Sequence, residues 1–341
     1  GDWRPRLRPP PLGGGRRYNG PADTLYSFVG PANQGLAGPV AVAADFSCQL
    51  ADPCLQGVLK GNGMTYENQT YGTKLTDMVV SGRFTGNRLE IDQLTAKAGT
   101  GSVAAKGYVS LSSADGYPMN IVATLDNARL ARSENIGARA TGTLTLAKTA
   151  GEAALLSGDL RLPETRYRIV REGAASVPVL TGVRRKPPSG RRRISGDGLA
   201  AVGGSLFDLI RLDIRLRAGE QIYVTGMGLE SEWQADVTLK GTTVAPRVTG
   251  EIELVRGTLD FAGRSLNLEQ GKVTFPTGDA YDPAINLLAT DTFDNVTVNV
   301  AVTGRASNPQ VAFSSVPGLP QDEIVSRILF GDSITSLSPL Q

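Results

Sequence analysis

Apolar and polar residues alternate along most of the chain from about Leu25 onward. Residues 211–217 alternate leucine or isoleucine with arginine or aspartate, and residues 296–302 alternate valine with threonine, asparagine or alanine. An alternation with a period of two residues is typical of β-strands that bury one face and expose the other. The chain is therefore predicted to consist mainly of strands, each with one apolar face to cover.

Parts of this strand pattern occur twice. Residues 156–169 align without a gap to residues 248–261, which predicts that one strand–turn–strand unit is used twice. A glycine followed five residues later by a proline also recurs, at Gly241 and at Gly304, and it predicts a kink or an edge between pleated segments. Repeated units that each leave one face uncovered are typical of solenoids and long stacked sheets.

Helical patterns are rare. Residues 199–210 form one candidate helix, which two adjacent glycines weaken. A second candidate begins with Pro320 and two acidic residues and ends before Gly331, as expected from the usual start and stop signals of helices. A short C-terminal helix is therefore predicted at about residues 320–330.

The composition excludes several classes of function. The 341 residues are 40% hydrophobic and 20% charged, which suffices for a sizeable core. The net charge of +2 does not fit a nucleic-acid clamp, and the scattered aromatic residues offer no stacking platform. The chain has no histidine and only two cysteines, so imidazole catalysis and the usual zinc sites are excluded. We predict no enzymatic activity, no cofactor, no metal and no nucleic-acid partner.

The chain divides into four parts by composition. Residues 1–20 are rich in arginine, proline and glycine and are predicted to be an extended linker. Residues 21–183 and residues 195–341 are two strand-rich parts, and the second ends in the predicted helix. Between them, residues 184–194 are strongly basic. They could contact lipid headgroups or nucleic acid, although the Pro-Pro-Ser-Gly centre favours a solvated loop.

Cys48 and Cys54 flank a turn signal at Asp52-Pro53. A disulfide between them is favoured, with two reduced thiols as the alternative. Closing so small a loop would contribute only roughly 2 kcal/mol to stability. A bridge would indicate an oxidising compartment, such as a bacterial periplasm or the outside of the cell.

No apolar stretch is long enough for a membrane-spanning helix, and no signal peptide is evident. The chain begins at Gly1. We expect it to be a processed form or a piece of a longer protein, with room for a membrane anchor upstream.

The one-faced strands need a second layer, and the predicted helices are too few to supply it. The strands could form sandwiches, closed barrels or solenoids, or an open trough that a ligand completes; the pattern does not choose between these. The aliphatic composition favours a trough for acyl chains, since exposing a sixteen-carbon tail to water costs about 12 kcal/mol. The residues predicted to line this interior, with ordinary core packing as the alternative for each, are Leu212, Ile214, Leu216, Ile252, Leu254, Leu259, Phe261, Val273, Phe275, Val298, Val300, Val302, Val311 and Phe313.

The C-terminal third carries recognisable motifs in residues 248–275, 281–286 and 298–313, and in the closing Leu319-Pro-Gln-Asp-Glu-Ile-Val-Ser-Arg-Ile-Leu-Phe-Gly331. These residues resemble the C-terminal portion of the TamB family, which is related to AsmA-like lipid transfer proteins. The resemblance implies an all-β fold: an elongated, repetitive, curved sheet, called a β-taco or open trough, with an apolar interior and a short C-terminal helix.

The resemblance also implies a function. TamB proteins are anchored in the inner membrane and cross the periplasm, and their C-terminal end meets an Omp85-type outer-membrane barrel of the TamA kind. They support outer-membrane protein (autotransporter) assembly and secretion, and phospholipid transport between the two membranes through the groove. The expected partners are therefore this barrel and phospholipid acyl chains, and the expected location is the periplasm.

The terminal segment is assigned to docking on the barrel, with a cap on the end of the sheet as the alternative. The docking residues are Leu319, Pro320, Asp322, Glu323, Ile328, Leu329 and Phe330. For the whole chain, the competing hypothesis is a closed β-solenoid that serves as a structural or adhesive scaffold without a lipid ligand. A polysaccharide-active enzyme would need a carboxylate pair, and no pair stands out among the acidic residues of the polar faces.

Overall fold

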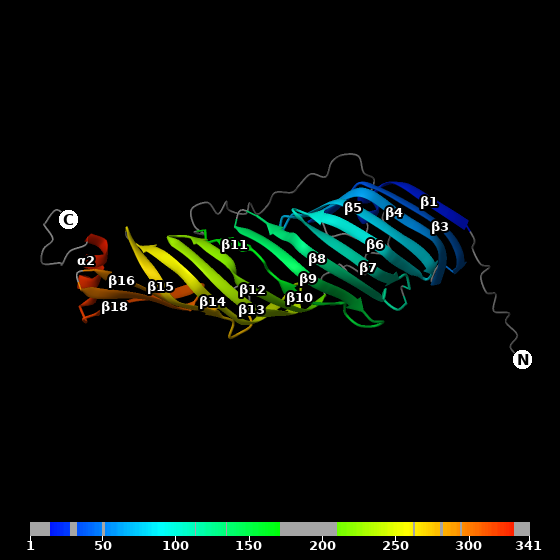
Figure 1. Cartoon of the computed structure of the whole chain (residues 1–341). Coiled ribbons are helices and arrows are strands. Elements are labelled where there is room, and N and C mark those ends of the chain that lie inside the picture. The colour runs from blue at the N-terminus through cyan, green and yellow to red at the C-terminus, as the bar shows by residue number, and fades with distance from the viewer. Residues whose placement is uncertain are drawn as a thin grey trace, which may run out of the picture.

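The computed structural model describes residues 14–27, 33–49, 52–112, 114–133, 135–170, 210–261, 263–279, 282–293 and 295–330. These residues form an elongated all-β molecule in which strands follow one another from the N-terminal end to the C-terminal end (Figure 1). The strands are β1 (Gly14–Pro21), β2 (Gln34–Ala37), β3 (Pro39–Gln49), β4 (Asp52–Asn68), β5 (Thr73–Gly86), β6 (Arg88–Ala98), β7 (Gly101–Ser110), β8 (Met119–Arg132), β9 (Ile136–Lys148), β10 (Leu155–Arg161), β11 (Thr165–Arg168), β12 (Arg211–Gly226), β13 (Leu229–Thr242), β14 (Pro246–Phe261), β15 (Arg264–Thr274), β16 (Ala284–Phe293), β17 (Val296–Arg305) and β18 (Asn308–Val316). The helices are α1 (Ala22–Tyr26) and α2 (Gln321–Phe330).

All the strands belong to one sheet. Each strand from β3 to β9, and each from β12 to β18, is antiparallel to the next. β10 and β11 join the two runs, because both are antiparallel to β9 and parallel to β12. No pairing among the described strands joins β18 to β1, so the sheet stays open. The prediction of an elongated all-β sheet with a short C-terminal helix is confirmed, and the closed barrel is excluded.

The sequence prediction is wrong for part of the N-terminal linker. Residues 14–20 belong to β1, which pairs with β3 along its whole length. An edge strand needs only backbone hydrogen bonds, so a glycine-rich and arginine-rich composition does not prevent it. The Tyr18 side chain also packs against buried residues of neighbouring strands. The rest of the predicted linker, residues 1–13, lies outside the described residues.

The predicted strand–turn–strand repeat takes another form. Residues 248–261 lie within the single strand β14, which carries a bulge between its two halves. The aligned residues 156–168 lie in β10 and β11, which follow the same line between β9 and β12. In place of the expected turn, β14 has a bulge, and the other copy has a break between β10 and β11. The chain does not reverse direction at either point, because the neighbouring strands continue along both parts of each copy.

The recurring glycine and proline mark two hairpins. Gly241 lies opposite Pro246 across the turn between β13 and β14, and Gly304 lies opposite Pro309 across the turn between β17 and β18. Both glycines have positive φ angles, which L-residues with a side chain rarely adopt. The pattern is thus an edge between pleated segments, as predicted.

Two sequence predictions fall on residues that the structure does not describe: the basic segment 184–194, and residues 199–210 except Ile210. Within the described part of the chain, neither helix has the length and apolar character needed to cross a membrane.

Candidate functional site: the apolar inner face of the sheet

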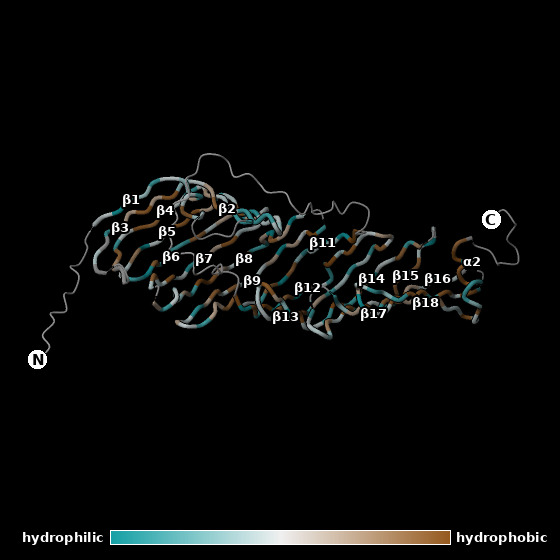
Figure 2. The backbone as a smooth tube through the Cα atoms, turned by 180° about the vertical axis from the view of Figure 1, so that it is seen from behind, coloured by the Kyte–Doolittle hydropathy of each residue, from teal (hydrophilic) through white to brown (hydrophobic). Residues whose placement is uncertain are grey.

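The sheet has two chemically different faces. Along β13, Glu230, Asp236 and Lys240 point to one face, and Trp233 and Leu239 point to the other. Cross-strand partners share a face, so the same division extends over the neighbouring strands. Figure 2 shows the resulting alternation of hydrophilic and hydrophobic segments along the strands. We call the charged side the outer face and the apolar side the inner face.

Ion pairs between neighbouring strands occupy the outer face. Arg215 Nη2 lies 2.6 Å from Asp236 Oδ2, and Arg83 Nη2 lies 2.7 Å from Asp92 Oδ1. The hydrogen bond from Arg215 lowers the pKa of the Asp236 carboxyl below its usual 3.8, and Arg83 does the same for Asp92. Each of these exposed ion pairs contributes little to stability, and their charged groups remain solvated, so this face stays exposed to water.

Three clusters of buried side chains follow one another along the inner face. The N-terminal cluster contains Ala22, Val40, Met64, Met78 and Ala96. The central cluster contains Ala98, Leu125, Ala128, Ala140, Leu160 and Ile214, with half-buried leucines such as Leu75, Leu130, Leu212, Leu216 and Leu239 packed against it. The C-terminal cluster contains Leu266, Leu268, Ala289, Val296, Val298, Val300, Ile324 and Ile328. Leu75 packs against both the N-terminal and the central cluster, so these two are continuous.

The sheet curls around this apolar face. The rings of Phe261 on β14 and Phe313 on β18 have centroids 6.1 Å apart, although four strand-to-strand steps separate them. In a flat sheet four steps would span about 19 Å. Near the middle of the sheet, Arg132 N donates to Tyr71 O at 3.0 Å, which brings the end of β8 to the start of β5. The inner face is therefore concave.

Trp233 lies on the inner face, between Leu239 of the central cluster and Leu229, which packs against the C-terminal cluster. Its indole Nε1 donates to Ser231 Oγ at 2.8 Å, which satisfies the donor in a buried position. A Cβ at Gly271 would lie 2.8 Å from Trp233 Cη2, so the indole reaches across β14 to β15. Trp233 is not among the residues that we predicted to line the interior. The polar residues that alternate with it along the strand would have indicated that it lies on the apolar face.

Most residues predicted to line the interior lie on the inner face. Ile214 is in the central cluster, and Leu212 and Leu216 pack against it. Val298 and Val300 are in the C-terminal cluster, and Leu254, Leu259 and Phe313 pack against it. Ile252, Val273, Phe275 and Val302 are half-buried, and Phe261 and Val311 are exposed.

Leu266 and Leu268 were missed although both are buried. The register between β15 and β16 shifts between Leu268 and Gln270, so Glu269 is an extra residue. Such a bulge reverses which side chains point inward further along the strand. An alternation counted back from Val273 therefore assigns the two leucines to the outer face, and the sequence gives no local sign of the bulge.

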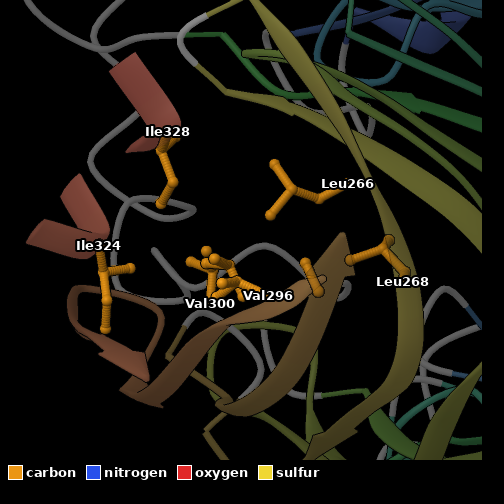
Figure 3. Close-up of a cluster of buried hydrophobic side chains, with 8 residues drawn as sticks. Leu266, Leu268, Val296, Val300, Ile324 and Ile328 are labelled. Atoms are coloured by element: carbon orange, nitrogen blue, oxygen red, sulfur yellow. The ribbon is translucent and has the colours of Figure 1, made fainter. Parts of the chain in front are cut away.

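The helix α2 covers the C-terminal end of the inner face. Ile324 and Ile328 are only 1% and 2% exposed, and they point toward Val296, Val300 and Leu266 (Figure 3). The two isoleucines are four residues apart, so they share one face of the helix. Val298 and Val300 therefore lie in a core beneath α2, where they are 0% and 3% exposed.

Burial divides the residues that were predicted to dock a partner. Ile328 was predicted to dock a partner, but its side chain is buried and faces the sheet. Leu319 also packs against the C-terminal cluster. Glu323 is half-buried and pairs with Arg327 at 2.8 Å. Pro320, Asp322 and Leu329 are exposed, and the side chain of Phe330 lies outside the described residues.

The sequence also predicted a disulfide. Cys54 is disulfide-bonded in the structure. The side chain of Cys48 lies outside the described residues, and the pairing of the two stays a prediction. Among the described residues, no three acidic or cysteine side chains are grouped in a way that could hold a metal ion.

Comparison with known proteins agrees with this architecture. Residues 92–341 match the family model of the TamB C-terminal domain. The chain is also 23% identical over 312 residues to the translocation and assembly module subunit TamB of Haemophilus influenzae. That alignment covers 89% of this chain and 24% of the relative, so the chain spans about a quarter of that protein's length. Because the family match extends over well more than half of the chain, the chain belongs to the TamB family.

Proposed function

We propose that this chain is the groove-forming part of a translocation and assembly module component in the periplasm. Its concave inner face carries phospholipid acyl chains between the inner and the outer membrane, and its C-terminal end meets an Omp85-type barrel. It supports outer-membrane protein (autotransporter) assembly without enzymatic chemistry. Family membership supports the module, and the inner face supports the lipid cargo.

The observation that carries the lipid proposal is the incomplete cover of the inner face. Leu75, Leu212, Leu216 and Leu239 remain half-buried, and no second layer of described residues lies over them. A sheet with one apolar face must cover that face, and an acyl chain supplies suitable apolar surface. Each methylene moved from water onto such a face contributes about 0.8 kcal/mol.

The inner face is long enough to hold a lipid tail. From β3 to β13 the inner face crosses nine strand-to-strand steps, or about 43 Å at about 4.8 Å per step. A bilayer core about 30 Å thick is two acyl chains deep, so one chain is about 15 Å long. The N-terminal and central clusters together therefore exceed the length of one lipid tail.

The test uses two adjacent positions on β13 that face opposite ways. Leu239→Asp places a charge on the inner face, and Thr238→Asp places the same charge on the outer face. The proteins are purified without detergent, extracted, and analysed by mass spectrometry for phospholipid per protein. We expect stoichiometric phospholipid in the natural protein and in Thr238→Asp, and a loss of at least several-fold in Leu239→Asp. A folded natural protein free of lipid would instead favour a closed scaffold.

Docking at the C-terminal end has a separate test. Leu329 is exposed on α2 and Val244 is exposed in the turn between β13 and β14, so Leu329→Asp and Val244→Asp are matched. Binding to a purified Omp85-type barrel should weaken at least about tenfold in the first variant and stay unchanged in the second. Equal binding by both variants, or equal loss, would contradict docking through α2.

A further inference from the structure

An arginine-lined cavity lies on the outer face at one rim of the sheet. Its volume is about 340 Å³, and its charged lining is Arg129, Arg132, Arg139, Glu164 and Arg166. β8 ends at Arg132 and β9 begins at Ile136, so the cavity sits where these strands turn. β8 and β11 pair with β9 on its two sides (Figure 1).

The register of the strands explains why the arginines converge. Arg129 lies opposite Arg139, and Arg132 and Arg166 both lie opposite Gly137. Partners across a ladder share a face, so all four arginines project from the same side. The register shift between Arg129 and Ala131 makes Leu130 a bulge residue, which brings Arg129 and Arg132 to one face although they are three residues apart.

The arginines of this cavity are not all paired with a carboxylate of their own. Glu164 is shared, with Oε1 2.7 Å from Arg166 Nη2 and Oε2 3.5 Å from Arg139 Nη1. Arg129 and Arg132 have no ion-pair partner in the part of the chain that the structure describes. By contrast, Arg83 and Arg215 each have an aspartate of their own. Among the described residues, the cavity lining therefore carries four arginines and one glutamate, and an anion would neutralise part of this charge.

The floor of the cavity is open enough to admit a ligand. Ala131, Gly137 and Ala138 form part of it, and a Cβ at Gly137 would meet no atom within 4 Å. Guanidinium groups bind phosphate oxygens through paired hydrogen bonds, and a site with several arginines favours a phosphate over a single-contact anion. The volume suits a group of headgroup size, near the lower end of small-molecule sites.

We propose that this cavity binds a phosphate group, and that it holds the phosphate of a phospholipid headgroup at the rim of the groove. The second part rests on the proposed function. Leu130, Ala128 and Ala140 face the central cluster from the same strand ends, so an acyl chain on the inner face would leave its headgroup at this rim. The cavity would then keep the phosphate beside the path of the chain and out of the apolar interior.

Two variants remove the site in different ways. Arg129→Gln with Arg132→Gln removes surplus charge and leaves both pairs of Glu164 in place. Gly137→Leu keeps every arginine and fills the cavity, and its backbone is not in the positive-φ region, so a side chain is tolerated. The control is Arg83→Gln with Arg215→Gln, which changes the net charge equally at paired positions. Circular dichroism and thermal unfolding establish that each variant is folded.

The first measurement is calorimetric titration with inorganic phosphate. We expect saturable binding of one phosphate to the natural protein and the control, and binding at least about tenfold weaker in both site variants, since a hydrogen bond to a charged group contributes about 1.5–3 kcal/mol. Equal binding by the natural protein and the site variants, no binding at all, or an equal loss in the control would overturn the site.

The second measurement identifies the source of the phosphate. The proteins are floated with phosphatidylcholine vesicles that contain or lack phosphatidylglycerol. Binding to either kind of vesicle that is lost in both site variants supports the headgroup, since both lipids carry a phosphate, and a requirement for phosphatidylglycerol would show that the site prefers a net anionic lipid. Phosphate binding without vesicle binding overturns the headgroup in favour of a soluble phosphate. Leu239→Asp should keep its phosphate binding, so a failed groove and a failed rim site give different results.

Discussion

Ile328→Ala tests how α2 is held on the inner face. The substitution removes three carbon atoms from a side chain that is 2% exposed among Val298, Val300 and Leu266. At about 0.8 kcal/mol per carbon, the lost burial amounts to about 2.4 kcal/mol, and an unfilled cavity would add to it. The neighbouring Leu329 is 46% exposed, so Leu329→Ala is the matched control.

The effect should be local, because α2 has only ten residues. A helix of this length is not stable in water by itself, so undocking of α2 is also its unfolding. Hydrogen exchange of the α2 backbone amides measures this opening directly. A loss of about 2.4 kcal/mol raises the exchange rates about fiftyfold in Ile328→Ala. In Leu329→Ala the loss should stay below about 1 kcal/mol, or about fivefold.

Two outcomes would refute this reasoning. Unchanged exchange in Ile328→Ala would mean that the isoleucine does not hold the helix. Equal acceleration in both variants would mean that the exposed face of α2 holds the helix as much as its buried face does. The amides of β17 serve as an internal reference, since Ala289 and Phe313 still flank Val300 after the substitution.

Three further predictions concern the two faces of the sheet. Gly271→Val should destabilise the protein by about 1–3 kcal/mol in urea unfolding and shift the fluorescence of Trp233, because the new side chain would overlap the indole; unchanged stability and emission would contradict this packing. Val300→Asp should destabilise by several kcal/mol, since the position is 3% exposed, whereas Val311→Asp, at 51% exposed, should change stability by less than about 0.5 kcal/mol; similar losses would show that both sites are equally covered. The folded-state pKa of Asp236 lies below 3.8, so its ion pair stabilises the fold above that pH and the contribution disappears as pH falls through the lowered pKa. The stability difference between the natural protein and Asp236→Asn should therefore be constant near neutral pH and vanish in acid, and a difference that persists in acid would exclude the ion pair as its source.

Much of the inner face could be predicted from residue pattern alone. The alternation in residues 211–217 placed Leu212, Ile214 and Leu216 on one face, and the structure has them together. The valines of β17 followed the same rule. Prediction failed at Leu266 and Leu268, because one extra residue at Glu269 reverses the alternation and only the pairing with β16 reveals it. Because bulges depend on the neighbouring strand and not on local propensity, they cannot be recognised from the sequence of one strand alone.

The rim cavity and the burial of Ile328 illustrate the same limit. The four arginines come from β8, β9 and β11, and nothing in their sequence positions brings them to one cavity. Ile328 was predicted to dock a partner, but the direction in which its side chain points depends on how the chain turns after β18. In both cases the deciding contacts are between residues distant in sequence.

The sequence by itself determined the all-β character, the two-faced strands, the terminal helix and the resemblance to the TamB family, because each follows from local periodicity or from a contiguous motif. Only the tertiary structure decided between sandwich, barrel and open trough, since a period of two shows that one face is apolar without showing what covers it. Tertiary structure also decided that α2 covers the C-terminal end and that the sheet curls until Phe261 meets Phe313. Curvature accumulates from the twist and the bulges of many paired strands, and it is therefore a property of the assembled sheet.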